Sequence, residues 1–306
     1  MPKDVFLSAT NMFIDAFIAY IKAERRYSVH TVRAYERDLR DFETYITEVE
    51  ESLTLLQVDT DIVRTWAAML IDEGKAASSV NRKLSALRTF YDFMRSEGNV
   101  AANPLFGLKG PKSKRMLPTF LREQEINKVI DDVRKSGDFV GQRNRAIILC
   151  FYETGIRLSE LVGLNVADVN FPNRSLKVFG KRSRERIIPL VNELYVALGE
   201  YMNARAGLVP ESQEALFVTP QGGRLSSSQV YRIVRRCLKG KTSLNKRSPH
   251  VLRHTFATVM LNNEAQLGVV KEILGHRSLT ATEIYTHLTF EELKKDYKKA
   301  HPRADK

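Results

Sequence analysis

Apolar residues recur at every third or fourth position through the first hundred residues, which is the spacing of one buried helix face. Four amphipathic helices with short connections are typical of a compact bundle. The four successive apolar sets are Phe13, Phe17 and Ile21; Val32, Tyr35, Leu39, Phe42 and Ile46; Ile62, Trp66 and Leu70; and Val80, Leu84, Leu87, Tyr91 and Met94.

Polar residues at the expected helix starts can accept hydrogen bonds from the first free backbone N–H groups. Ser28 is a suitable N-cap for the second helix. We expect the third helix to begin at Thr60 or Asp61, and Ser78 or Ser79 to cap the fourth.

From residue 121 onward the pattern mixes helical and extended segments. SLKVF and RIIPL alternate apolar and polar residues on either side of the turn GKRSRE, which predicts an antiparallel pair of strands. The fold class is therefore mainly α with a small antiparallel sheet, in which an N-terminal helical bundle precedes a mixed α+β domain. Further helices are expected at 123–135, 143–154, 192–205, 226–238 and 290–300.

The stretch NPLFGLKGPKSKRMLPTF separates these two parts. It has three prolines, two glycines and four Lys or Arg without an acidic residue, a composition that breaks regular structure. We predict domains at 1–108 and 121–306, joined by a basic linker at 109–120. The linker could follow an anionic backbone or could be a solvated hinge. The candidates for backbone contact are Lys109, Lys112 and Lys114.

Charge is distributed unevenly between the two parts. The chain has a net charge of +12; residues 1–108 carry 13 Lys and Arg against 16 Asp and Glu, whereas residues 109–306 carry the other 35 and 20. The basic excess favours an anionic partner such as nucleic acid. In the first part, Arg82, Lys83 and Arg88 share one helix and are candidates for phosphate contact, while a solvated helix face would explain them equally.

Several classes of protein are disfavoured. The chain begins MPKDVFLSATNMF, which lacks a signal-peptide pattern, and it has no apolar run of the ~20 residues that a membrane helix needs. Cys150 and Cys237 are far apart, which favours free thiols in a reducing cytoplasm, with no membrane association. HExxH and CxxC motifs are absent, and Arg235 stands where a phosphate loop through Gly240 needs glycine. We therefore expect no metal ion and no other cofactor.

The stretch 249–287 places polar residues at unusual positions in a helical pattern. His250 and Arg253 are three residues apart, so one helix face carries both. His276 follows a glycine, and Tyr285 lies nine residues later. Such a set suits attack on a phosphodiester, because arginines stabilise charge on the phosphate oxygens and a tyrosine hydroxyl can form a covalent intermediate.

Each candidate also has a simpler structural explanation. Arg157 could cap helix carbonyls, Lys181 could be a solvated turn residue, His250 could cap a helix, His276 could lie in a surface turn and Tyr285 could be a core aromatic.

Five segments, in order, resemble the motifs of the tyrosine recombinase, or phage integrase, family. The N-terminal FIDAFIAYIKAERRYSVHTVRAYERDLRDFETYI is similar to that family's SAM-like core-binding domain. The resemblance covers essentially the whole chain, is strongest to the bacterial Xer type, and outweighs the simpler explanations. The five segments are TGIRLSEL (154–161), FGKRSRERIIPL (179–190), PHVLRHTFAT (249–258), ILGHRSL (273–279) and TATEIYTH (280–287).

The resemblance implies a site-specific DNA recombinase and a role for each candidate. The turn after Lys181 departs from the family pattern, but Arg182 and Arg184 keep positive charge for DNA binding. The implied roles are nucleophile for Tyr285, clamps on the nonbridging oxygens for Arg157 and Arg253, general acid for Lys181, proton transfer for His250 and a phosphate hydrogen bond for His276.

The resemblance also implies partners. Family members act on double-stranded DNA at a specific recombination site, and four protomers assemble, as a homo-tetramer or as a hetero-tetramer with a related recombinase. The helix expected at 290–300 would dock into a neighbouring subunit through Leu293 and Tyr297. The biological task stays open among chromosome dimer resolution and the integration, excision or inversion of a DNA element. Two alternatives remain: a type IB topoisomerase-like enzyme and a non-catalytic DNA-binding protein on the same fold.

Overall fold

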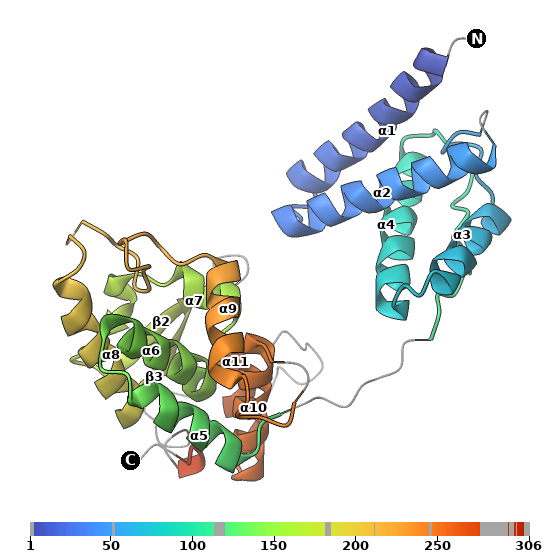
Figure 1. Cartoon of the computed structure of the whole chain (residues 1–306). Coiled ribbons are helices and arrows are strands. Elements are labelled where there is room, and N and C mark those ends of the chain that lie inside the picture. The colour runs from blue at the N-terminus through green and yellow to red at the C-terminus, as the bar shows by residue number, and fades with distance from the viewer. Residues whose placement is uncertain are drawn as a thin grey trace. The chain divides into compact units, whose positions relative to one another are not determined.

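The computed structural model divides the chain into two compact units, Met1–Met116 and Leu117–Lys306 (Figure 1). Helices dominate both units, and the one sheet among the described residues is antiparallel, so the predicted fold class is confirmed. The described residues are 3–50, 53–112, 120–180, 185–210, 212–244, 247–275, 293, 297 and 299–302, with side chains from Met12 onward.

The first unit is a bundle of helices around an aromatic and aliphatic core. Its centre holds Phe17, Phe42, Trp66 and Phe90, and all four side chains are fully or almost fully buried. The Phe42 and Trp66 rings lie 4.7 Å apart, so the second and third helices share this core. The helices are α1 (Lys3–Ala23), α2 (Val29–Val49), α3 (Thr60–Asp72) and α4 (Ala77–Ser96).

The helix starts follow the expectation in two of three cases. The Ser28 hydroxyl accepts a hydrogen bond from the Thr31 N–H at the start of α2, and α3 begins at Thr60, as predicted. The predicted serine cap of α4 is wrong, because α4 begins at Ala77 and Ala76 stands at the N-cap without a side-chain hydrogen bond. Alanine has the highest helix propensity, so the helix begins at Ala77, before the two serines.

The second unit is built around helix α6 (Phe139–Thr154), which is buried on almost every side. Its buried residues include Arg143, Arg145 and Glu153 beside the apolar side chains, and α5, α8, α9 and α10 pack around it. Its C-terminal end therefore lies inside the unit. The surrounding helices are α5 (Glu123–Arg134), α7 (Leu158–Gly163), the 3₁₀ turn η1 (Val166–Asp168), α8 (Asn192–Ala206), α9 (Ser227–Leu238), α10 (Pro249–Asn262) and α11 (Leu267–Leu274).

The sheet lies in the second unit and has the order β1 (Val169–Asn170), β2 (Ser175–Phe179) and β3 (Glu185–Pro189). The predicted strand pair is confirmed. Its register pairs Leu176 with Ile188 and Val178 with Arg186. Leu176, Val178 and Ile188 are buried, so Arg186 occupies a position on the inner face of the hairpin.

The described C-terminal residues pack on their own unit. Leu293, Tyr297 and Ala300 join its hydrophobic core, and the Tyr297 hydroxyl donates to the Glu153 backbone carbonyl. Both residues are thus buried in their own unit, and their role as anchors for a neighbouring subunit stays a prediction. A chain end rich in apolar residues is stabilised by whichever apolar surface it can reach, and α6 and α10 offer one here. In the described part of the chain, no helix is long and apolar enough to cross a membrane.

Candidate active site

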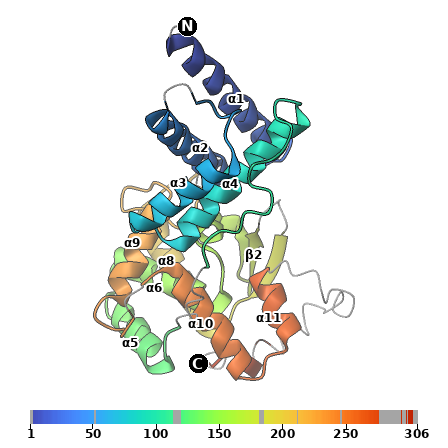
Figure 2. The ribbon, with the colours of Figure 1, turned by 90° about the vertical axis from the view of Figure 1, so that its right-hand side faces the viewer.

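Two helices of the second unit end side by side, each at a glycine with a left-handed backbone conformation. Helix α6 ends at Gly155 with φ +60°, and α11 ends at Gly275 with φ +61°, a conformation that glycine adopts without strain. A Cβ at Gly155 would lie 2.5 Å from Phe256 Cδ1 and 2.6 Å from Leu274 Cδ2. Glycine is thus required at position 155 both for the turn and for the close approach of α10 and α11, which lie together in Figure 2.

Arg157 follows this turn and stands at the N-cap of α7. Its Nη1 donates to Glu160 Oε1 at 2.8 Å, and its Nη2 donates to the Gly275 carbonyl at 3.0 Å. Its backbone N–H donates to Glu160 Oε2 at 2.7 Å, which satisfies a free donor at the helix start. About a third of the Arg157 side chain (32%) is exposed, so the guanidinium can still meet an anionic ligand.

Arg253 reaches the same place from α10. Its Nη1 donates to the Gly155 carbonyl and its Nη2 to the Leu274 carbonyl at 2.8 Å. Burial, with the charge of Arg157 as the next cause, lowers the pKa of Arg253 to about 10. The side chain is therefore protonated at neutral pH. Arg157 and Arg253 donate to the carbonyls of the adjacent residues Gly275 and Leu274, so the structure brings both predicted arginines to one point.

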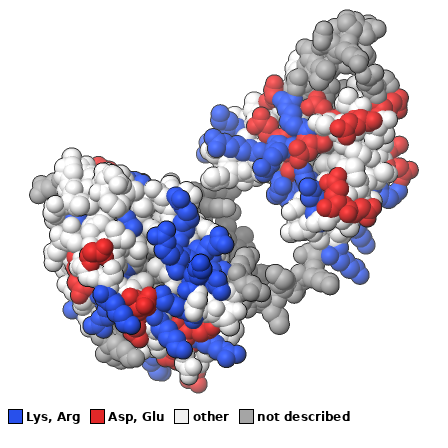
Figure 3. Space-filling model, in the orientation of Figure 1, with Lys and Arg blue, Asp and Glu red and all other residues white. Residues whose placement is uncertain are grey.

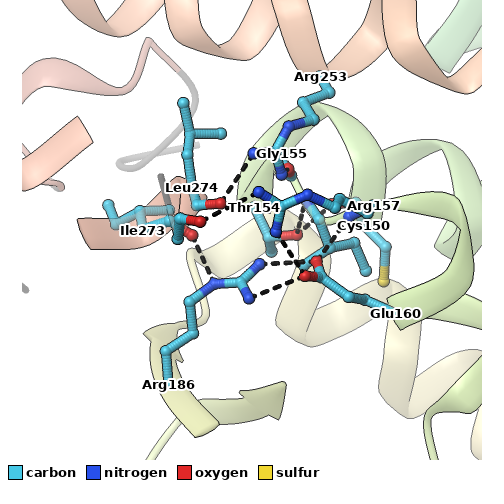
Figure 4. Close-up of polar contacts among 11 residues, drawn as sticks. Cys150, Thr154, Gly155, Arg157, Glu160, Arg186, Arg253, Ile273 and Leu274 are labelled. Carbon is cyan, nitrogen blue, oxygen red and sulfur yellow. Dashed lines mark hydrogen bonds and ion pairs between the residues drawn. The ribbon is translucent and has the colours of Figure 1, made fainter. Parts of the chain in front are cut away.

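Glu160 and Arg186 hold this arrangement together (Figure 4). Arg186 Nη1 and Nη2 donate to the two Glu160 carboxylate oxygens at 3.1 and 2.8 Å, and its Nε donates to the Ile273 carbonyl at 2.7 Å. Burial acts to raise the pKa of Glu160, but the hydrogen bonds from Arg186 and Arg157 outweigh it and lower that pKa. Glu160 therefore remains an anion between two arginines.

Sequence reasoning assigned no role to Glu160 or Arg186, although each left a signal. Glu160 is the third residue after Arg157, which is the spacing of a capping box at a helix start. Arg186 and Ile188 are two residues apart in a strand, so both face the same side. An arginine at an inward position needs a buried acidic or carbonyl partner, and here it has both.

Of the other predicted catalytic residues, the structure describes His250 alone. His250 is the second residue of α10 and is exposed, three residues before Arg253 and on the same face of the helix. Lys181, Arg182, Arg184, His276 and Tyr285 lie outside the described residues. Gly180 and Glu185 flank the first three of them, and Gly275 directly precedes His276. Within the described part of the chain, no three His, Cys, Asp or Glu side chains gather as metal ligands.

The candidate DNA contacts of the first unit are mostly engaged within the protein. Lys83 is 9% exposed, and its ammonium lies 2.5 Å from Asp41 and 3.4 Å from buried Asp38. Arg82 also pairs with Asp38, and Arg88 Nη2 donates to the Leu108 carbonyl at 3.0 Å. These ion pairs explain the charges of Arg82 and Lys83 structurally, so contact with phosphate stays a prediction for them.

The linker candidates are more accessible. Lys109 and Lys112 are exposed, whereas Lys114 lies outside the described residues. None of the described contacts engages the Lys109 or Lys112 ammonium, so both can meet an anionic ligand. Their contact with DNA also stays a prediction.

Comparison with known proteins gives a family. The profile described as Phage integrase, N-terminal SAM-like domain matches residues 14–98, and the one described as Phage integrase family matches residues 119–292. Tyrosine recombinase XerC of Halalkalibacterium halodurans is 38% identical over 301 residues, covering 96% of this chain and 98% of the relative. Tyrosine recombinase XerC of Thermodesulfovibrio yellowstonii is also 38% identical, covering 97% and 98%.

Solved structures agree at the level of the fold. The XerH site-specific recombinase, in a post-cleavage complex with a palindromic difH substrate, aligns with a TM-score of 0.72 at 24% identity. The alignment covers 89% of this chain and 80% of that one. Together with the identity to XerC proteins over nearly the full length, these matches show that the chain belongs to the phage integrase family of tyrosine recombinases.

Proposed function

We propose that the chain is a site-specific DNA recombinase that cuts and rejoins duplex DNA through a 3′-phosphotyrosyl bond to Tyr285. One observation carries the proposal: Arg157 and Arg253, which are nearly a hundred residues apart in sequence, meet at the paired ends of α6 and α11. His276 and Tyr285 follow that end of α11 in the sequence.

The two arginines suit the electrostatic demand of the reaction. A phosphodiester repels a nucleophile, and attack places more charge on its nonbridging oxygens. Guanidinium groups bind two oxygens at once and keep their protons. Because backbone carbonyls and Glu160 already fix the positions of Arg157 and Arg253, little reorganisation is needed when that charge develops.

The remaining steps are assigned to residues outside the described part of the chain, together with His250. The Tyr285 hydroxyl loses its proton with the help of His250 and attacks phosphorus. The bond from phosphorus to the 5′ oxygen breaks, and Lys181 gives that oxygen a proton. His276 hydrogen-bonds the phosphate. The 5′ hydroxyl of a second strand then attacks the phosphotyrosine, which restores Tyr285, and no external energy source is needed.

The proposed partners follow from the relatives. XerH and lambda integrase, to which the chain is similar in fold, were solved bound to DNA. We extend to this chain a specific duplex DNA site, assembly of four protomers with one another or with a related recombinase, and a cytoplasmic location. Lys109, Lys112 and Lys114, with Arg182 and Arg184, are the proposed contacts to the DNA backbone. We further propose that the reaction needs no metal ion and no other cofactor.

Covalent capture tests the proposal. Fragmented DNA of the host is incubated with the protein, the mixture is denatured, and protein-linked fragments are recovered and mapped. We expect linked fragments that share one sequence, and none with Tyr285→Phe. Relaxation of supercoiled plasmid without sequence preference would instead indicate a topoisomerase. Duplex binding without any linked fragment would indicate a non-catalytic DNA-binding protein.

A further inference from the structure

Helix α10, which carries His250 and Arg253, is joined by hydrogen bonds to the start of the second unit at two places. At the first, the Leu121 N–H donates to the Thr255 hydroxyl at 2.9 Å. The hydroxyl donates in turn to the Val251 carbonyl at 2.8 Å, one turn earlier in α10. Leu121 and Thr255 are buried, and a buried backbone N–H needs a partner. This first tether therefore fixes the residue after the interdomain linker to the first two turns of the helix.

The second tether lies ahead of α10, between Glu125 and Ser243. Glu125 Oε1 accepts hydrogen bonds from the Ser243 backbone N–H at 2.8 Å and from the Ser243 hydroxyl at 3.0 Å. Glu125 Oε2 accepts from the Arg122 N–H at 2.9 Å, at the start of α5. One carboxylate thus caps its own helix with one oxygen and holds the segment before α10 with the other. Two turns along α5, Asp132 also pairs with the Lys241 ammonium.

The start of α10 has few local contacts that fix it. Pro249, the first residue of the helix, has no N–H to donate. Ser248 stands at the N-cap, a position from which serine usually accepts a hydrogen bond from the first turn, but its side chain makes no capping hydrogen bond with the described first turn. The first turn therefore takes its position from the core beneath it and from the two tethers.

The position of this turn matters because it carries two residues of the proposed reaction. His250 is the second residue of α10, and Arg253 follows three residues later. The Gly155 and Leu274 carbonyls hold the guanidinium of Arg253, whereas the tethers hold the backbone from which both side chains extend. Apolar packing under the helix is non-directional, and hydrogen bonds have a preferred geometry. The tethers are thus the contacts that define how far the helix is rotated and shifted along its axis.

We propose that Thr255 and Glu125 are positioning residues for cleavage, which hold the first turn of α10 where His250 and Arg253 meet the phosphate. Neither residue touches the substrate, and each acts through the helix. Because Leu121 directly follows the linker, the first tether also connects the entry of the chain into the second unit with the helix of the active site. The inference rests on the proposed function, since it takes DNA cleavage as the reaction.

The tethers lie apart from the most basic surface of this unit. Helix α5 carries four acidic and two basic residues. Figure 3 shows Asp and Glu among the Lys and Arg over α5, whereas the surface over α9 is mainly basic. Thr255 is buried in the core side of α10. Substitutions in the tethers should therefore change the rate of cleavage rather than the affinity for duplex DNA.

The rate of linked-fragment formation at saturating DNA tests the first tether. Thr255→Val has almost the same shape and loses only the hydroxyl. The matched control is Tyr201→Phe in α8. The Tyr201 hydroxyl is also buried, donates to the Leu216 carbonyl at 2.9 Å and accepts from the Val218 N–H at 3.2 Å. Each substitution removes one hydroxyl between a backbone N–H and a backbone carbonyl, so the two should cost similar stability.

We expect Thr255→Val to form linked fragments about 10-fold more slowly, because a small displacement of catalytic groups is costly. Its dissociation constant for DNA should not change. Thr255→Ser keeps the hydroxyl and should restore most of the rate, and Tyr201→Phe should cleave like the wild type. A full rate for Thr255→Val, a loss of affinity alone, or an equal loss of rate in Tyr201→Phe would overturn the proposal.

Glu125→Gln tests the second tether at a site near the surface, where the fold is not at risk. Glutamine has one acceptor oxygen and an amide that donates, so it can accept from Arg122 or from Ser243 but not from both. We expect slower cleavage at saturating DNA with unchanged affinity. The matched control is Glu123→Gln, which removes an exposed acidic charge from the same turn of α5. Equal rates in these two variants would contradict the role of Glu125.

Hydrogen exchange keeps this proposal separable from the proposed function. Exchange of the α10 amides reports local opening of the helix whether or not DNA is cut. We expect faster exchange across α10 in Thr255→Val than in Tyr201→Phe, and equal exchange would overturn the tether. If the wild type forms no linked fragment, the recombinase proposal fails and the exchange alone decides whether the tether holds α10. If the wild type forms linked fragments while Thr255→Val and Tyr201→Phe cleave at equal rates, only the positioning proposal fails.

Discussion

The Arg186 guanidinium donates to both carboxylate oxygens of Glu160, at 3.1 and 2.8 Å, and so ties the inner face of strand β3 to the first turn of helix α7. The same guanidinium holds the last turn of α11 through the Ile273 carbonyl. Three segments that are distant in sequence are thereby fixed by one side chain. Arg157 takes its position from two of them, through Glu160 and Gly275.

Arg186→Lys should slow cleavage while leaving DNA affinity nearly unchanged. Lysine keeps the charge but cannot bind both oxygens of Glu160 and the Ile273 carbonyl together. A lost hydrogen bond to a charged group costs about 1.5–3 kcal/mol, which corresponds to about a 10- to 100-fold slower covalent step. The rate of linked-fragment formation at saturating DNA is compared with the dissociation constant. A variant that cleaves at the full rate, or one that loses only affinity, would contradict the positioning role.

Glu160→Gln should reduce stability in a way that depends on pH. The folded-state pKa of Glu160 is lowered, so its ion pairs stabilise the protein above the usual carboxyl pKa of 4.5 and are lost as pH falls through the folded value. We therefore expect the free energy of unfolding of the variant to lie below that of the wild type at pH 7. The difference should shrink below pH 4.5. Urea titrations of both proteins at pH 7 and below pH 4.5 measure the two free energies of unfolding. A difference that does not change with pH would disprove the role of the Glu160 charge.

Tyr297 tests whether the C-terminal residues stabilise their own unit. Tyr297→Phe removes one buried hydrogen bond to the Glu153 carbonyl and should cost about 1 kcal/mol. Tyr297→Ala leaves a cavity beside Phe256 and should cost about 3–5 kcal/mol. Unfolding of the second unit is followed at protein concentrations low enough to keep monomers. Unchanged midpoints for both variants would favour docking into a neighbouring subunit instead.

Lys83 and Lys109 should separate stability from DNA contact. Lys83→Met removes the ion pairs with Asp38 and Asp41 and should cost about 1.5–3 kcal/mol of stability in the first unit. It should leave the salt dependence of duplex binding as it was. Lys109→Met should do the opposite, lowering the slope without changing the unfolding midpoint, because Lys109 is exposed. If Lys83→Met lowers the slope by about 1, the ammonium leaves its carboxylates to bind phosphate.

The spacing of apolar residues predicted most of the helices and the strand pair, because the buried face of each element determines that spacing. The apolar faces of α2 and α3, with Phe42 and Trp66, and the strand pair β2–β3 follow directly from spacings of 3.6 and 2. The start of α4 did not follow, because the propensity of Ala76 and Ala77 outweighed the capping ability of the serines behind them. Helix propensity and serine capping favour different start positions there, and the spacing of apolar residues does not decide between them.

The site was predictable only in part. Arg157 and Arg253 could be named from motifs, and the structure brings them together. Glu160 and Arg186 could not be assigned, because their value lies in a contact between residues that are 26 positions apart. A motif identifies residues by their spacing along the chain, whereas the pairing of Glu160 with Arg186 arises only when distant segments meet in the fold.

The carbonyl oxygens of Gly155, Leu274 and Gly275 set the positions of the two arginines, so the protein rather than the substrate determines their pose. A fixed pair stabilises one transition state from whichever side it is approached, and it therefore speeds strand joining as much as strand cutting. It follows that the arginine site gives the reaction no direction. Whether DNA ends recombined or restored must be decided by the strand that is offered to the phosphotyrosine.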